Sequence, residues 1–394
     1  MARCRTFRYL LQPTSRQKAA LALLLRLQCE LYNAALEERR GAWRWGRRSI
    51  SYIDQTKTLT ALREVRPEVL ASGVTVCRGT LQRLDRAFSA FYRRCREGQR
   101  PGYPRFKSAR RFDSLQWEDR SGWRLDEEAR RLWLLGIGHV KVRQHRSLRG
   151  VPKAITVKRE GRRWFVSVRC TEVPARPLPP TGKEVGIDLG ICALVATSDG
   201  ELVTEGRFAK RAAGKLACAQ RAFSQKRRGS KRRERAAVAV GRAHRKIANQ
   251  RRDLHHQLSR RLVDAYDFIV VEDLRIAQMV RRPRPRPDGT GGFLGASAKR
   301  GLNRSICDAG WGQLVAFLGY KAEEAGRQVL VINPRYSSLT CSSCGHRAQG
   351  NRLTQAVFSC QACGHGAHAD VNAAVNILRA GRARQASACE GSGN

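Results

Sequence analysis

Three acidic residues stand where predicted strands end or a predicted helix begins. Asp188 closes the apolar run in VGIDLG, Glu272 follows the apolar run in VVEDL, and Asp370 opens ADVNAAVNIL. A carboxylate in apolar surroundings is costly unless a cation or hydrogen bonds compensate it. Together, three such groups would hold two divalent cations, one activating water and the other stabilising the departing oxygen of a phosphodiester. Hard oxygen ligands favour Mg²⁺ or Mn²⁺ over zinc.

The combination of the three acids supports this prediction, because any one acid at an element end is more simply explained as a cap. Asp273 follows Glu272 directly, and the alternation of a strand turns it to the opposite side, so we leave it out of the metal set. His368 is either a contact to the scissile phosphate or a solvated loop side chain. Asn372 and Asn376, four residues apart, either touch the substrate or cap and bridge locally.

Two CxxC pairs account for four of the 13 cysteines, namely Cys341, Cys344, Cys360 and Cys363. Their spacing matches a zinc ribbon, and a glycine follows each pair and allows the chain to turn. Four thiolates close a tetrahedral site, so the predicted zinc is structural and not catalytic. The other cysteines form no framework, which indicates reduced thiols and not disulfides.

The charge predicts a nucleic-acid partner. The chain has 76 Lys and Arg against 33 Asp and Glu, a formal net charge of +43, which a compact protein tolerates poorly without a polyanion. Between Arg207 and Arg261 stand 19 basic and only 2 acidic residues. A solvated helix face would interleave acids, so this region favours a helix that faces nucleic acid. An Arg-rich proteome or a membrane-surface protein are the alternatives.

Candidate nucleic-acid contacts lie in two basic stretches. The first stretch combines arginines with aromatic side chains that could stack on bases, although an arginine over a core aromatic is the simpler explanation for any single pair. The predicted contacts are Arg93, Arg94, Tyr103, Arg105 and Lys107 in the first stretch, and Arg227, Arg228, Lys231, Arg232, Arg233, Arg245, Arg251 and Arg252 in the second.

The N-terminal half has the pattern of a β domain with a helical insert. Alternating runs predict strands in residues 1–12 and 100–175. Residues 13–99 carry apolar residues at helical spacing, with Ser15 as the first cap, and form the predicted helical insert. The proline-rich residues 176–182 are a predicted linker.

The C-terminal half has the element order of a ribonuclease H-like α/β fold. A three-strand meander, a basic helical region, the strand FIVVEDL, a helix over 299–325, the strand VLVIN and a helix ending at Gly381 follow one another. We assign residues 183–336 and 367–381 to this RuvC-like domain, 337–366 to the zinc module and 382–394 to a flexible tail. RRPRPRPDGTGG is a predicted mobile loop.

The apolar run Ala19–Leu25 stops at Arg26 and is too short to span a bilayer. We therefore expect a cytoplasmic prokaryotic protein that associates with the nucleoid when it binds DNA.

Several of these segments together resemble the TnpB family of transposon-encoded RNA-guided nucleases, relatives of the type V CRISPR effectors. They are GIDLGI, VVEDL, SSLTCSSCGH with FSCQACGH, and ADVNAAVNIL. AFYRRCREGQRPGYPRFKS and GLNRSICDAGWGQLVAFLGYKAEEAGRQV also resemble family segments. The likeness therefore extends over most of the chain.

The resemblance implies an N-terminal wedge barrel interrupted by a helical recognition domain, followed by a RuvC-like domain with an inserted zinc module. It implies that Asp188, Glu272 and Asp370 form the catalytic triad and that the four cysteines hold zinc. HAD stands where many members have an Arg-containing DRD, a departure that affects a flanking contact. The family also implies a guide RNA, a short target-adjacent DNA motif, and cleavage of both strands of double-stranded DNA.

Two other functions are compatible with parts of the pattern. A transposase on the same fold usually has its acids in the order Asp, Asp, Glu, whereas the order here is Asp, Glu, Asp. A nucleic-acid-binding regulator without catalysis would not need the three acids, and all three are present. Both facts favour the nuclease.

Overall fold

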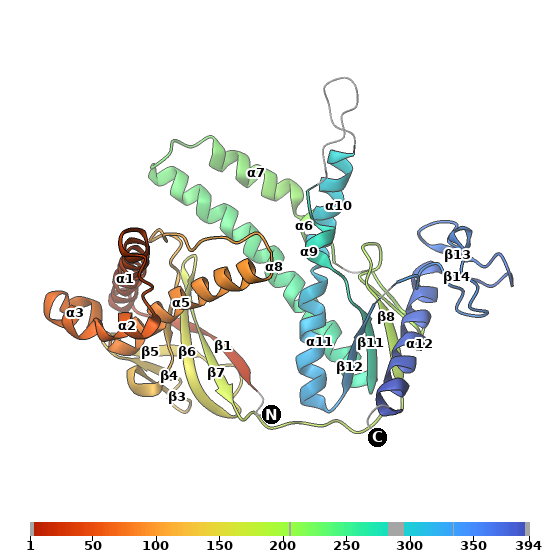
Figure 1. The fold of residues 1–394 in the computed structure, drawn as a ribbon, viewed down its shortest axis with the longest axis horizontal. Helices are drawn as coiled ribbons and strands as arrows, with labels where there is room; N and C mark the ends of the chain where they lie inside the picture. The colour runs from red at the N-terminus through yellow and green to blue at the C-terminus, as the bar shows by residue number, and fades with distance from the viewer. Residues whose placement is uncertain (1–3, 205, 283–294, 334, 391–394) are drawn as a thin grey trace. The chain divides into compact units, whose positions relative to one another are not determined.

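The computed structural model describes residues 4–204, 206–282, 295–333 and 335–390, and it divides into two compact units, Met1–Pro174 and Ala175–Asn394 (Figure 1). Residues 283–292 of the predicted mobile loop and 391–394 of the predicted tail lie outside the described residues.

Unit 1 is an antiparallel sheet with helices packed on it. Its strands follow the order β2-β6-β7-β1-β5-β4-β3, so the N-terminal strand lies inside the sheet and completes it, as predicted. The elements are β1 (Arg5–Gln12), α1 (Ser15–Gly46), α2 (Tyr52–Lys57), α3 (Leu59–Val65), α4 (Pro67–Leu70), α5 (Val74–Arg96), β2 (Ser114–Trp117), a 3₁₀ turn (Arg120–Gly122), β3 (Trp123–Asp126), β4 (Arg131–Leu134), β5 (Gly138–Arg143), β6 (Val151–Glu160) and β7 (Arg163–Thr171).

The helices of unit 1 share one hydrophobic core with the sheet. α1 begins after Thr14 and not after the predicted cap Ser15, because the Thr14 side chain accepts the Gln17 N–H at 3.3 Å. Gly79 lets α5 approach β2, since a Cβ there would lie 2.4 Å from the Gln116 carbonyl oxygen. The predicted helical region is therefore packed with the β domain in one compact unit.

Two observations qualify the expectations for unit 1. β2 and β3 form the two edges of the sheet among the described residues, so hydrogen bonds do not close it into the implied barrel. By length and composition α1 is the one described helix that could cross a membrane, yet half of its most apolar 18-residue window is buried.

Unit 2 contains a five-stranded sheet in the order β10-β9-β8-β11-β12. β8, β9 and β10 form the predicted antiparallel meander, and β11 runs parallel to both β8 and β12. The elements are β8 (Glu184–Asp188), β9 (Val195–Thr197), β10 (Leu202–Val203), α6 (Phe208–Arg211), α7 (Ala213–Ser224), α8 (Lys231–Ala265), β11 (Phe268–Glu272), α9 (Ile276–Met279), α10 (Ala296–Ala309), α11 (Trp311–Ala325), β12 (Gln328–Ile332), a 3₁₀ turn (Gln349–Asn351), β13 (Val357–Ser359), β14 (Gly366–His368) and α12 (Ala369–Glu390).

Helices cover both faces of this sheet. α8 and α11 pack on the face that carries Ile187, Ile269 and Val271, and α12 packs on the face that carries Phe268 and Val270 (Figure 1). The alternation of the strands thus gives each face its own core. Asp188 and Glu272 share the parity of the face that α12 covers.

Three predicted segments of unit 2 differ in the structure. The basic region 207–261 forms the short helix α6 and a hairpin of α7 and α8, because the chain turns at Gly229 with φ of 85°. The predicted helix 299–325 is two helices, because Gly310 adopts φ of 68° between them. α12 passes Gly381 and continues to Glu390, because Gly381 serves close packing on Val270 and does not terminate the helix.

The predicted linker is held along unit 2. The amides of Arg176 and Leu178 donate to the carbonyls of Glu324 and Ala325, at 2.8 and 3.0 Å. The Thr181 amide donates to the carboxylate of Asp267 at 2.9 Å. These residues are therefore part of the packed unit and not a free spacer.

Candidate active site and cysteine cluster

The first two predicted catalytic acids lie at the carboxyl ends of neighbouring parallel strands. Ile187 of β8 pairs with Val271 of β11. Asp188 and Glu272 are the next residues on these two strands, so they lie beside each other at the same end of the sheet. The Glu272 carboxylate accepts the Leu189 amide at 2.9 Å. This hydrogen bond fixes the glutamate side chain against the segment that follows Asp188.

The third acid comes from the first turn of α12, which lies on the same face of the sheet. α12 reaches β8 because Gly186 has no side chain; a Cβ there would lie 2.0 Å from the Ala374 carbonyl oxygen. A Cβ at Gly190 would lie 3.8 Å from the Asp370 carboxylate, which places that carboxylate beside the loop after β8. The three sequence-distant acids therefore meet at one end of the sheet, as predicted.

Burial and the repulsion of neighbouring carboxylates raise the pKa values of Asp188 and Glu272. Burial, then the Asp370 carboxylate, raises the pKa of Asp188 to about 7, while Arg352 acts to lower it. Burial, then the Asp188 carboxylate, raises the pKa of Glu272 to about 8 against the lowering effect of the Leu189 amide. Glu272 and Asp370 are 7% and 6% exposed. Such a group of buried like charges is stable in its ionised form only beside a cation.

Arg352 is a residue of the site that the sequence did not predict. Its guanidinium donates to the Asp370 carboxylate at 3.0 Å and to the Gln355 carbonyl at 2.9 Å. It comes from the segment between the two CxxC pairs. Nothing in the sequence distinguishes it among 76 basic residues, because only the fold brings this segment to the start of α12.

The structure also locates the polar residues around Asp370. The His368 ring accepts the Asp370 amide at 3.3 Å, so it caps the start of α12. Asn372 accepts the Ser342 amide at 2.8 Å and donates to the Thr340 carbonyl at 2.8 Å. Asn376 donates to that same carbonyl at 2.7 Å. Of the two alternatives, these asparagines bridge α12 to the cysteine module. Asp273 lies just beyond the end of β11 and is exposed.

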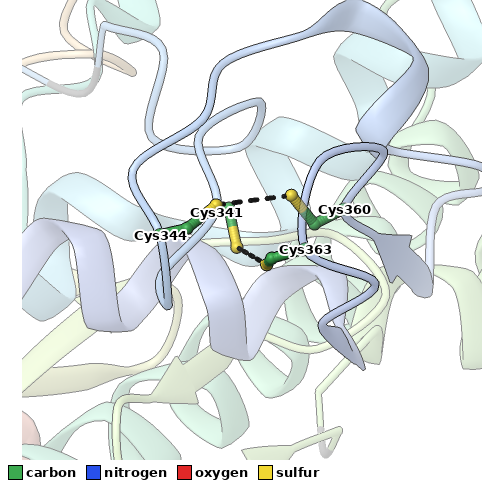
Figure 2. A group of neighbouring side chains, drawn as sticks. All are labelled: Cys341, Cys344, Cys360 and Cys363. Carbon is green, nitrogen blue, oxygen red and sulfur yellow. Dashed lines mark hydrogen bonds between the residues drawn. The ribbon is translucent and has the colours of Figure 1, made fainter.

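The four cysteines form one cluster. Their sulfur atoms all lie within 4.8 Å of one another, and Figure 2 shows the side chains converging from two loops. The sulfurs of Cys341 and Cys363 are 3.7 Å apart, and those of Cys344 and Cys360 are 3.6 Å apart. A tetrahedral zinc with Zn–S bonds of about 2.3 Å requires sulfurs about 3.8 Å apart. The cluster therefore has the dimensions of a four-thiolate metal site.

The two loops repeat one hydrogen-bond pattern. In the first, the Cys341 amide donates to the His346 carbonyl at 2.9 Å and the Gly345 amide donates to the Cys341 carbonyl at 3.0 Å. Cys360, His365 and Gly364 repeat both bonds in the second loop. Gly345 and Gly364 have φ of 78° and 70°, which explains why glycine follows each pair.

Comparison with known proteins agrees with this arrangement. A family model described as "Probable transposase" matches residues 166–282, and one described as "Cas12f1-like, TNB domain" matches residues 311–377. The provisionally named RNA-guided DNA endonuclease InsQ of Escherichia coli is 32% identical over 97% of this chain and 94% of its own length. A similarly named protein of Streptomyces pristinaespiralis is 34% identical over 98% of this chain and 90% of its own length. The chain belongs to the TnpB family.

The likeness of this TnpB family member extends to a CRISPR-associated protein over a shorter region. The endodeoxyribonuclease Cas12f1 of Sulfoacidibacillus thermotolerans is 31% identical over 55% of this chain and 50% of its own length. The second family model covers α11, β12, the cysteine module and the first part of α12, up to residue 377.

The predicted nucleic-acid contacts of unit 1 lie around α5 and the loop after it. Arg93 forms an ion pair with Glu97 at 4.0 Å, and Arg94 lies in the same helical turn. Tyr103 and Arg105 are exposed. The Lys107 ammonium lies 5.9 Å from the Tyr32 ring centroid. These positions are compatible with nucleic-acid contacts.

In unit 2 the predicted contacts fall into two classes. Arg233 donates to the carbonyls of Phe223 and Lys226, at 3.1 and 2.7 Å, and so closes the α7–α8 hairpin. Arg251 donates to the Cys307 carbonyl at 3.0 Å and ties α8 to α10. These internal contacts already explain both arginines. The remaining members are exposed or half-buried along the turn and α8: Arg227, Arg228, Lys231, Arg232, Arg245 and Arg252.

Proposed function

We propose that this TnpB family member is an RNA-guided, divalent-metal-dependent DNA endonuclease of a transposable element. Relatives that match it over nearly their whole length have RNA-guided DNA endonuclease in their names. One observation supports the chemistry most directly: Asp188, Glu272 and Asp370 converge from distant parts of the chain at one end of the sheet. We assign unit 2 to the ribonuclease H-like, RuvC-like class on its strand order.

The donor set of the three acids fits Mg²⁺ or Mn²⁺. Asp188, Glu272 and Asp370 would hold two such ions, which supply an activated water and stabilise the departing oxygen of the phosphodiester. The chain itself orients the ligands. The Leu189 amide holds Glu272, and Arg352 holds Asp370. Because burial raises the pKa values of Asp188 and Glu272, each must lose a proton when a cation binds.

We propose a structural zinc in the cysteine cluster. Four thiolates at tetrahedral spacing leave no open position for a substrate. The metal would instead hold the two loops together, and Asn372 attaches the first loop to α12. Arg352 lies between the two cysteine pairs, so the zinc would indirectly position its guanidinium beside Asp370.

The proposed partners are a guide RNA and double-stranded target DNA with a short adjacent motif. A net charge of +43 and the exposed basic residues of the α7–α8 hairpin support polyanion binding. We assign sequence recognition to base pairing with the guide, as in RNA-guided effectors generally. Unit 1 would be the wedge and recognition part, and the protein would act in the bacterial cytoplasm.

The test separates catalysis from binding. Asp188→Ala should reduce the rate of Mg²⁺-dependent cleavage of matched DNA by at least about 10³-fold, while RNA binding is retained. Asp273→Asn is the matched control, because this exposed acid lies next to Glu272 and outside the trio. Cleavage by Asp188→Ala at the rate of the control would overturn the assignment. Strand-transfer products from the purified protein would instead favour a transposase.

A further inference from the structure

Two neighbouring segments of unit 1 expose four large aromatic side chains. Trp43 and Trp45 at the end of α1 are 53% and 82% exposed, and Tyr103 and Phe106 in the loop after α5 are 43% and 50% exposed. Eight other large aromatic side chains of this unit are buried in its core, including Trp117 and Trp123. Exposing large apolar rings is unfavourable in water, so a cluster of them indicates a binding surface.

Guanidinium groups lie over three of these rings. The Arg40 guanidinium is 5.1 Å from the Phe106 ring centroid, Arg44 is 5.1 Å from Trp45, and Arg47 is 5.8 Å from Trp43. The surface thus alternates positive charge with flat apolar rings. A protein or lipid partner would not require this alternation, whereas a nucleotide presents a phosphate and a flat base to such a surface.

A cleft lies where the two segments meet. It has a volume of about 580 Å³, and it is lined by Arg40 of α1 and by the loop residues Arg100, Pro101, Gly102, Tyr103, Pro104, Arg105 and Phe106. No acidic residue is among them. Sites for small molecules span about 300–1,000 Å³, so the cleft has room for a nucleotide.

The loop that forms the cleft is held in place. Asn33 of α1 accepts the Lys107 amide at 2.8 Å and donates to the Lys107 carbonyl at 2.8 Å. The Tyr103 ring packs edge-on against Phe88 and Phe91, with centroids 5.6 and 5.3 Å apart. A preformed cleft loses less entropy on binding than a flexible loop would.

The helix extends the surface from the cleft to Trp43. Arg40, Trp43 and Arg44 lie on one stripe, since residues three and four apart are neighbours on a helix. From residue 40 to residue 46 the helix rises about 9 Å, enough for two or three bases stacked about 3.4 Å apart. Arg40 also forms an ion pair with Glu37 at 3.6 Å, and both side chains are exposed. Such an exposed pair is weak and readily exchanged for a phosphate.

We propose that this aromatic groove, made by residues 40–48 and 100–106, binds unpaired nucleotides of a single strand. The bases would stack on Trp43, Tyr103 and Phe106, and the phosphates would contact the arginines. In a duplex the faces of each base are covered by the base pairs stacked above and below it, so a duplex cannot use the rings in this way. Whether the strand is guide RNA or displaced DNA rests on the proposed function. Both strands present the same groups to the groove, namely flat bases and phosphates.

Fluorescence anisotropy with the full chain tests the groove. The probes are labelled oligouridine and oligothymidine of about 15 nucleotides and a deoxyribose–phosphate strand of equal length without bases. The wild type should bind both base-containing strands at least about 10-fold more tightly than the abasic strand. Trp43→Ala/Trp45→Ala should remove most of that difference and leave the salt dependence unchanged, because stacking releases no counterions.

Ile53→Ala/Val65→Ala is the matched control, since these apolar side chains of the same unit are 62% and 76% exposed. It should bind like the wild type. Phe106→Ala tests the cleft separately and should also weaken base-dependent binding. A preference for uridine or for thymidine supports the groove and identifies RNA or DNA as the strand.

Equal binding of base-containing and abasic strands by the wild type would overturn the proposal, as would wild-type affinity in both aromatic variants. The binding assay needs no cleavage, so the two proposals fail separately. If the complex cuts no DNA but base-dependent binding is lost in Trp43→Ala/Trp45→Ala, the proposal of the groove is supported and the proposal of guided cleavage is refuted. If guided cleavage holds and these variants bind normally, only the groove falls.

Discussion

Replacing Asp188 by asparagine should stabilise the protein when divalent cations are absent and the pH is high. Burial and the Asp370 carboxylate raise the pKa of Asp188 from an ordinary 3.8 to about 7. About three pKa units correspond to about 4 kcal/mol of cost for ionising this carboxyl in the folded, cation-free protein. Asparagine has nearly the same shape and no charge, so the variant avoids this cost.

The sign follows from proton binding. The folded state holds the Asp188 proton to a higher pH than the unfolded state does, so the free energy of unfolding falls as the pH rises from about 4 to about 7. Below that window the wild type and Asp188→Asn should be equally stable in this respect. Above it the variant should be more stable by up to about 4 kcal/mol. Loss of the Asp188 charge should also lower the pKa of Glu272 from about 8.

Native-state hydrogen exchange of the β8 and β11 amides measures this local free energy of unfolding. It is recorded in Mg²⁺-free buffer at about pH 5 and about pH 8.5, with intrinsic exchange rates corrected at each pH. Asp273→Asn is the control and should follow the wild type. Adding Mg²⁺ at high pH should stabilise the wild type and not Asp188→Asn. If the free energy of unfolding had the same pH dependence in all three proteins, the trio would not be a group of buried carboxylates that repel one another.

Three further outcomes are expected. Arg352→Ala should slow cleavage by about 10- to 100-fold and shift the pH–rate profile upward, because Arg352 lowers the pKa of Asp188; an unchanged profile would contradict its role. Gly186→Ala should reduce the free energy of unfolding by at least about 2 kcal/mol in urea titrations, because its Cβ would clash with α12. Its control is Gly214→Ala in α7, where a Cβ meets nothing within 4 Å and stability should hold or rise. Cys344→Ser should lower the zinc content measured by elemental analysis, and undiminished zinc would exclude the cluster as its site.

The site could be predicted from sequence where local pattern and chemistry coincide. Asp188 and Glu272 each end a short apolar strand, so their meeting at one sheet edge follows from parallel pairing. The cysteine spacing predicted the cluster because a CxxC turn with a following glycine is a local structure. Strand alternation was the reason to leave Asp273 out of the metal set, and in the structure this residue lies exposed just beyond the end of β11.

The rest depends on contacts between distant segments. Arg352 belongs to the site only because Asn372 and Asn376 bring the cysteine module to α12. Gly381 has the pattern of a helix end, yet it is a packing position against Val270, so the helix continues to Glu390. Gly310 divides the predicted helix 299–325 into two helices with a single left-handed residue, which periodicity alone does not reveal. The closure of a sheet is likewise a property of its edges, and β2 and β3 remain unpaired to each other among the described residues.

The central claim is that the carboxylate trio cleaves DNA chosen by a bound RNA. In the most direct measurement, the protein is expressed from its native locus and purified, and the RNA that co-purifies is sequenced. That complex is then tested with Mg²⁺ on matched and mismatched DNA. We predict one discrete RNA, cleavage of matched DNA only, and no cleavage by the Asp188→Ala complex that carries the same RNA. Cleavage of mismatched DNA as fast as matched DNA, or cleavage by the Asp188→Ala complex, would contradict the account.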